Sequence, residues 1–264
     1  MSTLKILVLG GSSEASALAA LLADDPRFDA ILSLAGRTVA PVLPAIACRI
    51  GGFGGASGLA HYLQDNAIQA LVVATHPFAT QIRDNAVTAA GGTKTPLLMI
   101  ERPAWQAQKS DRWTEMADMA QAATALGPTS RRVLLTIGRK DLLPFAAAPW
   151  HDYVIRSVDA PPPEFLPPGA KTITARGPFK LEDERRMLHA ERIEVIVTKN
   201  SGGTATQAKL IAARERDIPV ILVARPPWPD VTGLDAASVT DAAGALNWLE
   251  ARHGAAASPA KRGV

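Results

Sequence analysis

The feature that most constrains the fold of this chain is the alternation of short apolar runs with longer segments of helical periodicity. Such alternation is typical of βαβ units, in which helices join parallel strands. In the first half of the chain the predicted elements are strands at 5–10, 30–35, 46–50, 70–75 and 96–100, helices at 14–23, 58–66 and 80–90, and a long helix at 112–126. After Gly127-Pro128-Thr129-Ser130 the pattern begins again, with strands at 132–137, 153–158, 171–175, 194–198 and 220–224 and helices at 181–191, 204–217 and 241–252.

Two successive five-strand alternations favour two doubly wound, Rossmann-like α/β domains with parallel sheets over a single closed eight-strand barrel. Gly127 and Pro128 end the long helix, so we predict the domain boundary there. The expected organisation is an N-terminal dinucleotide-binding domain at 1–127 and a C-terminal Rossmann-like domain at 128–253 that closes on the substrate across a ligand cleft. Residues 254–264 are small and polar and are expected to form a disordered tail.

The composition of the chain indicates which kinds of partner it is not expected to bind. Lysine and arginine number 28 against 25 acidic residues, and a net charge of +3 is small for a dedicated nucleic-acid binder. No apolar run reaches the roughly 20 residues of a membrane helix, and residues 1–5 carry no export-type cleavage pattern. The single Cys48 excludes an internal disulfide and a multi-cysteine metal site. We expect a cytoplasmic protein without metal that binds neither nucleic acid nor membrane.

The first chemical motif follows the first predicted strand. It consists of two glycines, two serines and an acid at a helix start, namely Gly10, Gly11, Ser12, Ser13 and Glu14. Unpaired N–H groups at a helix N-terminus attract phosphate, and glycines allow close approach of the ligand. The motif therefore predicts a phosphate site, although an ordinary turn with a serine N-cap is the alternative.

Arg37 and Thr38 follow the second predicted strand. An NAD-binding domain places an acidic residue in this region, for the ribose 2′-hydroxyl. No acid stands beside Arg37, and a guanidinium can pair bidentately with a 2′-phosphate. This favours NADP over NAD; the alternative is a solvent-facing arginine in a turn.

The loops after the third and fourth predicted strands add cofactor candidates. One loop surrounds an aromatic residue with glycines, Gly51, Gly52, Phe53, Gly54 and Gly55, which indicates backbone lying against a flat ligand with Phe53 as cover. The other holds Thr75 and His76, which would face a ligand at the carboxyl end of the sheet. His76 is a candidate proton donor or carboxylate ligand, or else a structural helix cap.

The second half of the chain repeats this arrangement with basic and amide groups. Lys199, Asn200, Ser201, Gly202 and Gly203 stand between a predicted strand and a helix, and their combination favours an anion site over a plain capped turn. Further candidates for binding an anionic substrate follow two other strands of this half: Arg139, Lys140, Arg176, Gly177 and Phe179.

Taken together and in order, these segments resemble the precorrin-6A reductases of corrin (cobalamin) biosynthesis. The resemblance extends to about Pro226 and rests on the motifs above, together with Glu101-Arg102-Pro103-Ala104-Trp105. It implies NADPH-dependent reduction of the C18–C19 double bond of precorrin-6A, a polycarboxylate macrocycle, to give precorrin-6B. At one position the chain departs from the family pattern: Val73 stands where an aspartate is frequent, so the fourth strand supplies no carboxylate.

The implied roles divide between the halves of the chain. The first domain holds NADPH, the second holds the carboxylate arms, and His76, Lys199 or water supplies the proton. We expect a monomer with transient contacts to neighbouring pathway enzymes. Two alternatives remain: an NADP-dependent reductase of another anionic substrate, and a non-catalytic dinucleotide sensor.

Overall fold

Two six-stranded parallel sheets, each covered by its own helices, make up this protein. The computed structural model describes residues 3–36 and 44–257. The chain divides into two compact units: unit 1 holds residues up to Arg102 and from Pro226 on, and unit 2 holds Pro103–Arg225. The prediction of two doubly wound α/β domains is confirmed.

The sheet of unit 1 has the strand order β12-β5-β4-β1-β2-β3. Read from the other edge this is the strand order of a dinucleotide-binding Rossmann sheet. The strand order reverses between β1 and β4, and this switch point is where such sheets bind ligands. Its strands are β1 (Leu4–Leu9), β2 (Phe28–Leu34), β3 (Ala47–Ile50), β4 (Ala70–Val73), β5 (Leu97–Ile100) and β12 (Ala236–Val239). Its helices are α1 (Ser13–Leu22), α2 (Gly55–Asp65), α3 (Thr80–Thr93) and α7 (Ala242–Ala257).

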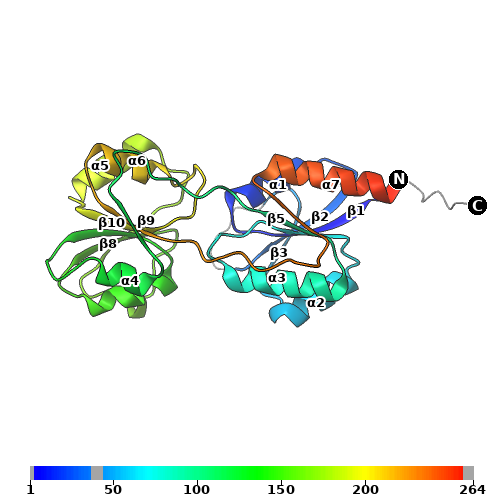
Figure 1. Cartoon of the computed structure of the whole chain (residues 1–264), viewed down its shortest axis with the longest axis horizontal. Helices are drawn as coiled ribbons and strands as arrows, with labels where there is room; N and C mark the ends of the chain where they lie inside the picture. Colours follow the sequence, from blue (N-terminus) through cyan, green and yellow to red (C-terminus); the bar gives the residue numbers. More distant parts are fainter. Residues whose placement is uncertain (1–2, 37–43, 258–264) are drawn as a thin grey trace, which may run out of the picture. The chain divides into compact units, whose positions relative to one another are not determined.

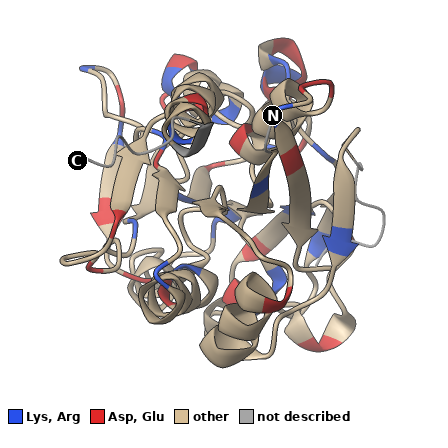
Figure 2. Cartoon of the chain, turned by 90° about the vertical axis from the view of Figure 1, so that its right-hand side faces the viewer, with Lys and Arg blue, Asp and Glu red and all other residues tan. Residues whose placement is uncertain are grey.

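Helices cover both faces of this sheet. Helices α1 and α7 lie on one face and α2 and α3 on the other (Figure 1). Figure 2 faces this unit and shows lysines and arginines interspersed with acidic residues along its ribbon. Ile6 and Val8 of β1 pack in the core on the α1–α7 side, whereas Leu7 and Leu9 pack toward α2 and α3. Because both faces are buried, β1 is a continuous apolar run from Ile6 to Leu9.

The sheet of unit 2 has the order β6-β11-β10-β7-β8-β9, and its switch point lies between β7 and β10. Its strands are β6 (Trp113–Met116), β7 (Arg132–Thr136), β8 (Asp152–Ser157), β9 (Lys171–Thr174), β10 (Val195–Lys199) and β11 (Val220–Val223). The helices are α4 (Met119–Thr124), α5 (Leu181–Ala190) and α6 (Ala208–Glu215), with short 3₁₀ turns η1 (Arg139–Asp141), η2 (Leu143–Ala147) and η3 (Pro163–Phe165).

The structure corrects the predicted helix at 112–126. Residues Trp113–Met116 form β6, which pairs in parallel with β11, and only the short α4 follows. Asp118 accepts a hydrogen bond from the Gln121 amide and so begins α4 within the predicted helix. Trp113 and Thr114 favour extended backbone once a neighbouring strand is present, which local periodicity does not reveal.

The structure also differs from the expected domain limits. Gly127, with φ of 77°, lies just beyond the end of α4 inside unit 2, so it ends a helix rather than a domain. β12 was not predicted, and it returns with α7 to unit 1. Of the expected tail at 254–264, residues 254–257 are helical and the rest lie outside the described residues. No helix in the described part of the chain is long and apolar enough to cross a membrane.

Candidate active site

The switch point of unit 1 is tied together by Ser12. Its hydroxyl accepts a hydrogen bond from the Ala15 amide at 3.2 Å, which makes Ser12 the N-cap of α1. The same hydroxyl donates to the Ala74 carbonyl at the end of β4, at 2.7 Å. A Cβ on Gly10 would lie 2.7 Å from Leu32 Cδ1, and Gly11 has a φ of 122°. The serine side chain is therefore used internally, the backbone at Gly11 favours glycine, and a side chain at position 10 would have to displace Leu32.

Glu14, at the start of α1, is neutralised by Arg102. The Arg102 guanidinium lies 2.9 Å from the Glu14 carboxylate and donates to Ser13 Oγ at 3.3 Å. A bare carboxylate here would repel a bound phosphate, so the ion pair keeps the helix N-terminus suitable for anions.

The glycine-rich loop after β3 is organised by Arg49. Its guanidinium donates to Ser33 Oγ at 2.8 Å and to the carbonyls of Gly51 and Gly52, both at 3.1 Å. It also stacks 3.9 Å from the Phe53 ring centroid. Phe53 thus supports an arginine in addition to any ligand. The sequence analysis did not assign Arg49 to the site, although its position two residues before Gly51 was a usable signal.

Backbone around this edge is open at five glycines. They are Gly11, Gly51, Gly52, Gly54 and Gly55. A Cβ placed on any of the five would meet no atom within 4 Å, and all except Gly52 have positive φ. Gly58 is different, because its Cβ would lie 1.7 Å from the Phe53 carbonyl oxygen. The loop therefore packs tightly against α2 at Gly58, and its other glycines leave space beside the backbone. The interpretation of a flat ligand lying on this loop requires such space.

Thr75 and His76 lie at the carboxyl end of β4. Thr75 is buried, and its hydroxyl has no hydrogen-bond partner among the described residues. His76 Nδ1 accepts a hydrogen bond from the Phe78 amide at 3.2 Å, which places the proton of a neutral ring on Nε2. Arg37 and Thr38 lie outside the described residues.

In unit 2, the motif after β10 is bonded largely within the protein. Lys199 Nζ lies 2.6 Å from Asp141 Oδ2 in the loop after β7. The buried Asn200 side chain accepts from the Trp105 amide at 2.9 Å and donates to the Trp105 carbonyl at 3.2 Å. Gly202 admits no side chain, since a Cβ would lie 2.1 Å from the Pro103 carbonyl oxygen. Asn200 therefore positions the Trp105 segment.

The loops after β9 and β10 are joined to each other. The Phe179 amide donates to the Ala205 carbonyl at 3.0 Å, and the Trp105 indole donates to the Gly203 carbonyl at 2.8 Å. Under Phe179, the Arg156 guanidinium lies 4.0 Å from the ring centroid and 2.5 Å from the Glu184 carboxylate. The two predicted substrate loops thus form one block, whereas Arg139, Lys140 and Arg176 are exposed.

A lysine is buried in the same block. Lys209 Nζ lies 5.0 Å from the Trp105 ring centroid and donates to the Thr206 carbonyl at 2.9 Å. Burial lowers the pKa of Lys209 to about 7, and the positive charge of Arg156 acts in the same direction.

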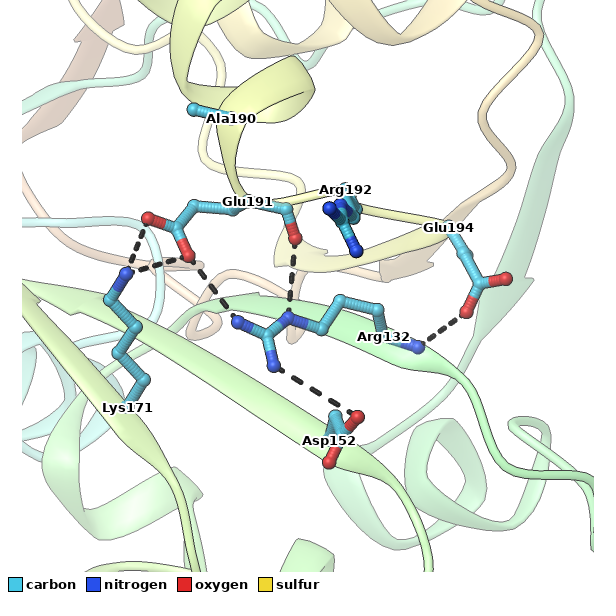
Figure 3. A pocket seen from close by; sticks show the side chains of 7 residues that line it. All are labelled: Arg132, Asp152, Lys171, Ala190, Glu191, Arg192 and Glu194. Carbon is cyan, nitrogen blue, oxygen red and sulfur yellow. Dashed lines mark hydrogen bonds and ion pairs between the residues drawn. The ribbon is translucent and has the colours of Figure 1, made fainter.

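A cavity of about 680 Å³ lies at the opposite edge of this sheet (Figure 3). It is lined by Arg132, Asp152, Lys171, Ala190, Glu191, Arg192 and Glu194, at the amino ends of the strands. Lys171 Nζ is 2.6 Å from one Glu191 carboxylate oxygen, and an Arg132 nitrogen is 3.4 Å from the other. Hydrogen bonding from Lys171 lowers the pKa of Glu191. Ligands of open α/β sheets bind at the carboxyl edge, so this ion-paired cavity is not the candidate active site.

Comparison with known proteins identifies the family. Residues 5–250 match the model of the family described as precorrin-6x reductase CbiJ/CobK. The chain belongs to this family. It is 49% identical over 221 residues to a precorrin-6A reductase of Sinorhizobium sp., covering 84% of this chain and 85% of that protein. It is 46% identical over 245 residues to a precorrin-6A reductase of Rhodococcus erythropolis, covering 93% and 97%.

A solved structure agrees with the sequence comparison. The structure described as CobK precorrin-6A reductase superposes with a TM-score of 0.89 at 45% identity, covering 99% of this chain and 100% of that one. The reductase resemblance drawn from the ordered motifs is therefore confirmed at the level of family and fold. Among the residues that the structure describes, no group of three or more His, Cys, Asp or Glu side chains is arranged to hold a metal ion.

Proposed function

We propose that this protein catalyses the NADPH-dependent reduction of the C18–C19 double bond of precorrin-6A, giving precorrin-6B, in cobalamin biosynthesis. The observation that carries the proposal is the high identity, over most of both chains, with relatives named precorrin-6A reductase. The reaction adds one hydride and one proton across the double bond.

The cofactor is assigned to the carboxyl edge of unit 1. Support comes from the Rossmann strand order, the open backbone at Gly11 and Gly51–Gly55, and the α1 N-terminus. When bound, NADPH supplies the hydride. In this proposal Arg37 and Thr38 hold the 2′-phosphate, with Arg49 beside the end of β2 as a further cation. Glycines 10 and 11, with Ser13, give the phosphates close access to the helix.

The macrocycle is assigned to the carboxyl edge of unit 2. Arg139, Lys140 and Arg176 present exposed cations that suit acetate and propionate carboxylates. Ser201, Gly202 and Gly203 after β10 and Gly177 after β9 offer backbone and hydroxyl groups, and Phe179 offers a ring face for the flat macrocycle. Asn200 acts indirectly, by holding Trp105.

The proton has two candidate donors in this proposal. His76, just after β4, is the first: its Nδ1 accepts a hydrogen bond from the Phe78 amide, so a neutral ring carries its proton on Nε2. Lys199 offers an ammonium oriented by Asp141. The cytoplasmic location, the monomeric state and the transient contacts with pathway enzymes stay predictions from the sequence.

The test follows NADPH oxidation at the nicotinamide absorbance, using purified protein and precorrin-6A, with NADH and no-substrate controls. We expect macrocycle-dependent oxidation with a preference for NADPH, and Arg37→Ala should reduce that preference by about 10-fold or more through loss of a charged hydrogen bond. Oxidation with another anionic substrate only would favour the alternative reductase. Tight NADPH binding without oxidation of any substrate would favour the sensor.

A further inference from the structure

Arg83 is the most unusual ionisable group in unit 1. It lies in the first turns of α3, on the face that packs against the core, and only 1% of it is exposed. A guanidinium is a fixed cation with five N–H donors. None of its three nitrogens has a hydrogen-bond partner among the described residues. Leaving a buried charge without acceptors is costly, so a site of this kind calls for a missing partner.

Its surroundings supply stacking but no acceptor. The guanidinium carbon lies 4.4 Å from the ring centroid of Trp228, in the segment that returns the chain to unit 1. Asp84 and Glu101 are the acidic groups whose charge reaches Arg83, and neither is bonded to it. Burial is the main cause that lowers the pKa of Arg83, yet an arginine remains charged at neutral pH.

A second polar group without a partner lies in the same connection. Among the described residues of unit 1, only Thr75 and Arg83 have buried side-chain nitrogen or oxygen atoms without a hydrogen bond. Thr75 lies two residues beyond the end of β4, and Arg83 lies in the first turn of α3, so both belong to the ligand edge of the sheet. A hydroxyl and a guanidinium are both hydrogen-bond donors, and a donor is what an oxyanion requires.

We propose that the β4–α3 connection is an oxyanion site in which Arg83, beneath Trp228, binds a carboxylate or phosphate group of a ligand. Because the guanidinium nitrogens are fully covered, binding requires the half-buried Trp228 side chain to move aside. The inference rests on the proposed function only for the source of the oxyanion, which is either a phosphate of the dinucleotide or a carboxylate arm of the macrocycle.

The test compares the full-length chain with Arg83→Met and Arg83→Lys by calorimetric titration with NADP⁺, inorganic pyrophosphate and precorrin-6A. We expect Arg83→Met to lower the affinity for one class of ligand by about 10- to 100-fold, because a charged hydrogen bond is lost. The affinity of Arg83→Lys should lie between those of the wild type and Arg83→Met. If affinity falls for NADP⁺ and pyrophosphate, Arg83 binds a phosphate of the dinucleotide. If affinity falls for precorrin-6A alone, Arg83 binds a carboxylate of the macrocycle. Lys94→Met, which removes an exposed charge at the other end of α3, is the matched control.

A thermal melt separates binding from structure. Replacing a buried charge that has no partner by an apolar side chain of similar length is often neutral or stabilising, so ligand-free Arg83→Met should melt at or above the wild-type temperature. Affinities within threefold of wild type for all three ligands would overturn the proposal; if Arg83→Met does not fold, Arg83→Lys decides by the same criterion. Failure of the proposed function appears differently, as absence of precorrin-6A-dependent NADPH oxidation by the wild type.

Discussion

At the scale of single residues, Lys209 links the burial of a charge to the pH dependence of stability. Its pKa in the folded protein is about 7, well below the ordinary 10.5, because burial disfavours the charged form. The unfolded chain therefore binds more protons between these values, so the contribution of Lys209 to the free energy of unfolding rises with pH across that window.

Urea titrations at pH 7, 8 and 9 test this. The free energy of unfolding of the wild type, relative to Lys209→Met, should increase by up to about 1.4 kcal/mol per pH unit. Lys180→Met, which removes an exposed lysine of the same unit, is the matched control. A constant difference between wild type and Lys209→Met would show that Lys209 stays charged in the folded protein.

Single residues also show what sequence reasoning about a site can miss. Asn200, Ser12 and Glu14 stand where polar groups of a ligand site are expected, and each is bonded to another part of the chain. Asn200 meets Trp105, which is 95 residues away in sequence. A motif indicates that a polar group is needed at a strand end, but its partner depends on which distant segment folds against it.

At the scale of elements, the loops after β9 and β10 depend on a buried ion pair. Arg156 contacts both Glu184 and the Phe179 ring, so its loss leaves a buried carboxylate and an unsupported aromatic side chain. We expect Arg156→Met to lower the free energy of unfolding by roughly 3–5 kcal/mol. It should also raise the KM for precorrin-6A by about 10-fold, with NADP⁺ affinity unchanged, since about 1.4 kcal/mol of lost binding energy is tenfold.

A double variant distinguishes positioning from simple loss of stability. Arg156→Met/Glu184→Leu removes both charges and should recover much of the stability but not the KM, because Phe179 still lacks its support. Arg186→Met, whose side chain is 75% exposed, is the control. Recovery of the KM together with stability would assign the pair a purely structural role.

The elements also show where local patterns fail. Strongly apolar strands such as β1 and β4 are buried on both faces and were predicted within two residues at each end. The edge strands β6 and β12 were missed, because they are short and mixed in polarity and extend only by pairing with β11 and β5. Their conformation is set by a neighbour rather than by their own sequence.

At the scale of the whole molecule, unit 2 is continuous and unit 1 is not. Residues Pro103–Arg225 hold a complete six-stranded sheet with its own core, whereas unit 1 takes β12 and α7 from the C-terminal part of the chain. We expect an excised 103–225 fragment to unfold cooperatively in urea, as an independent domain does.

The fragment 1–102, which lacks the C-terminal part of unit 1, should not unfold cooperatively in urea. Ala245 and Leu249 of α7 are buried in the core beside α1, so removing α7 exposes apolar surface of the sheet. Circular dichroism during urea titration, with the full chain as control, measures both fragments. Cooperative unfolding of 1–102 alone would show that α7 is dispensable for unit 1.

The fold class could be predicted from the order of residues, because βαβ alternation and glycine-rich strand ends are local properties of neighbouring residues. The family could be predicted from the resemblance of the ordered motifs. Three features arise only on folding. Strand β6 joins the sheet of unit 2 while β12 joins that of unit 1, Asn200 and Ser12 bond to distant backbone, and Arg83 is buried without an acceptor among the described residues. Each depends on contacts between residues far apart in sequence, whose free energy exists only once the chain has folded.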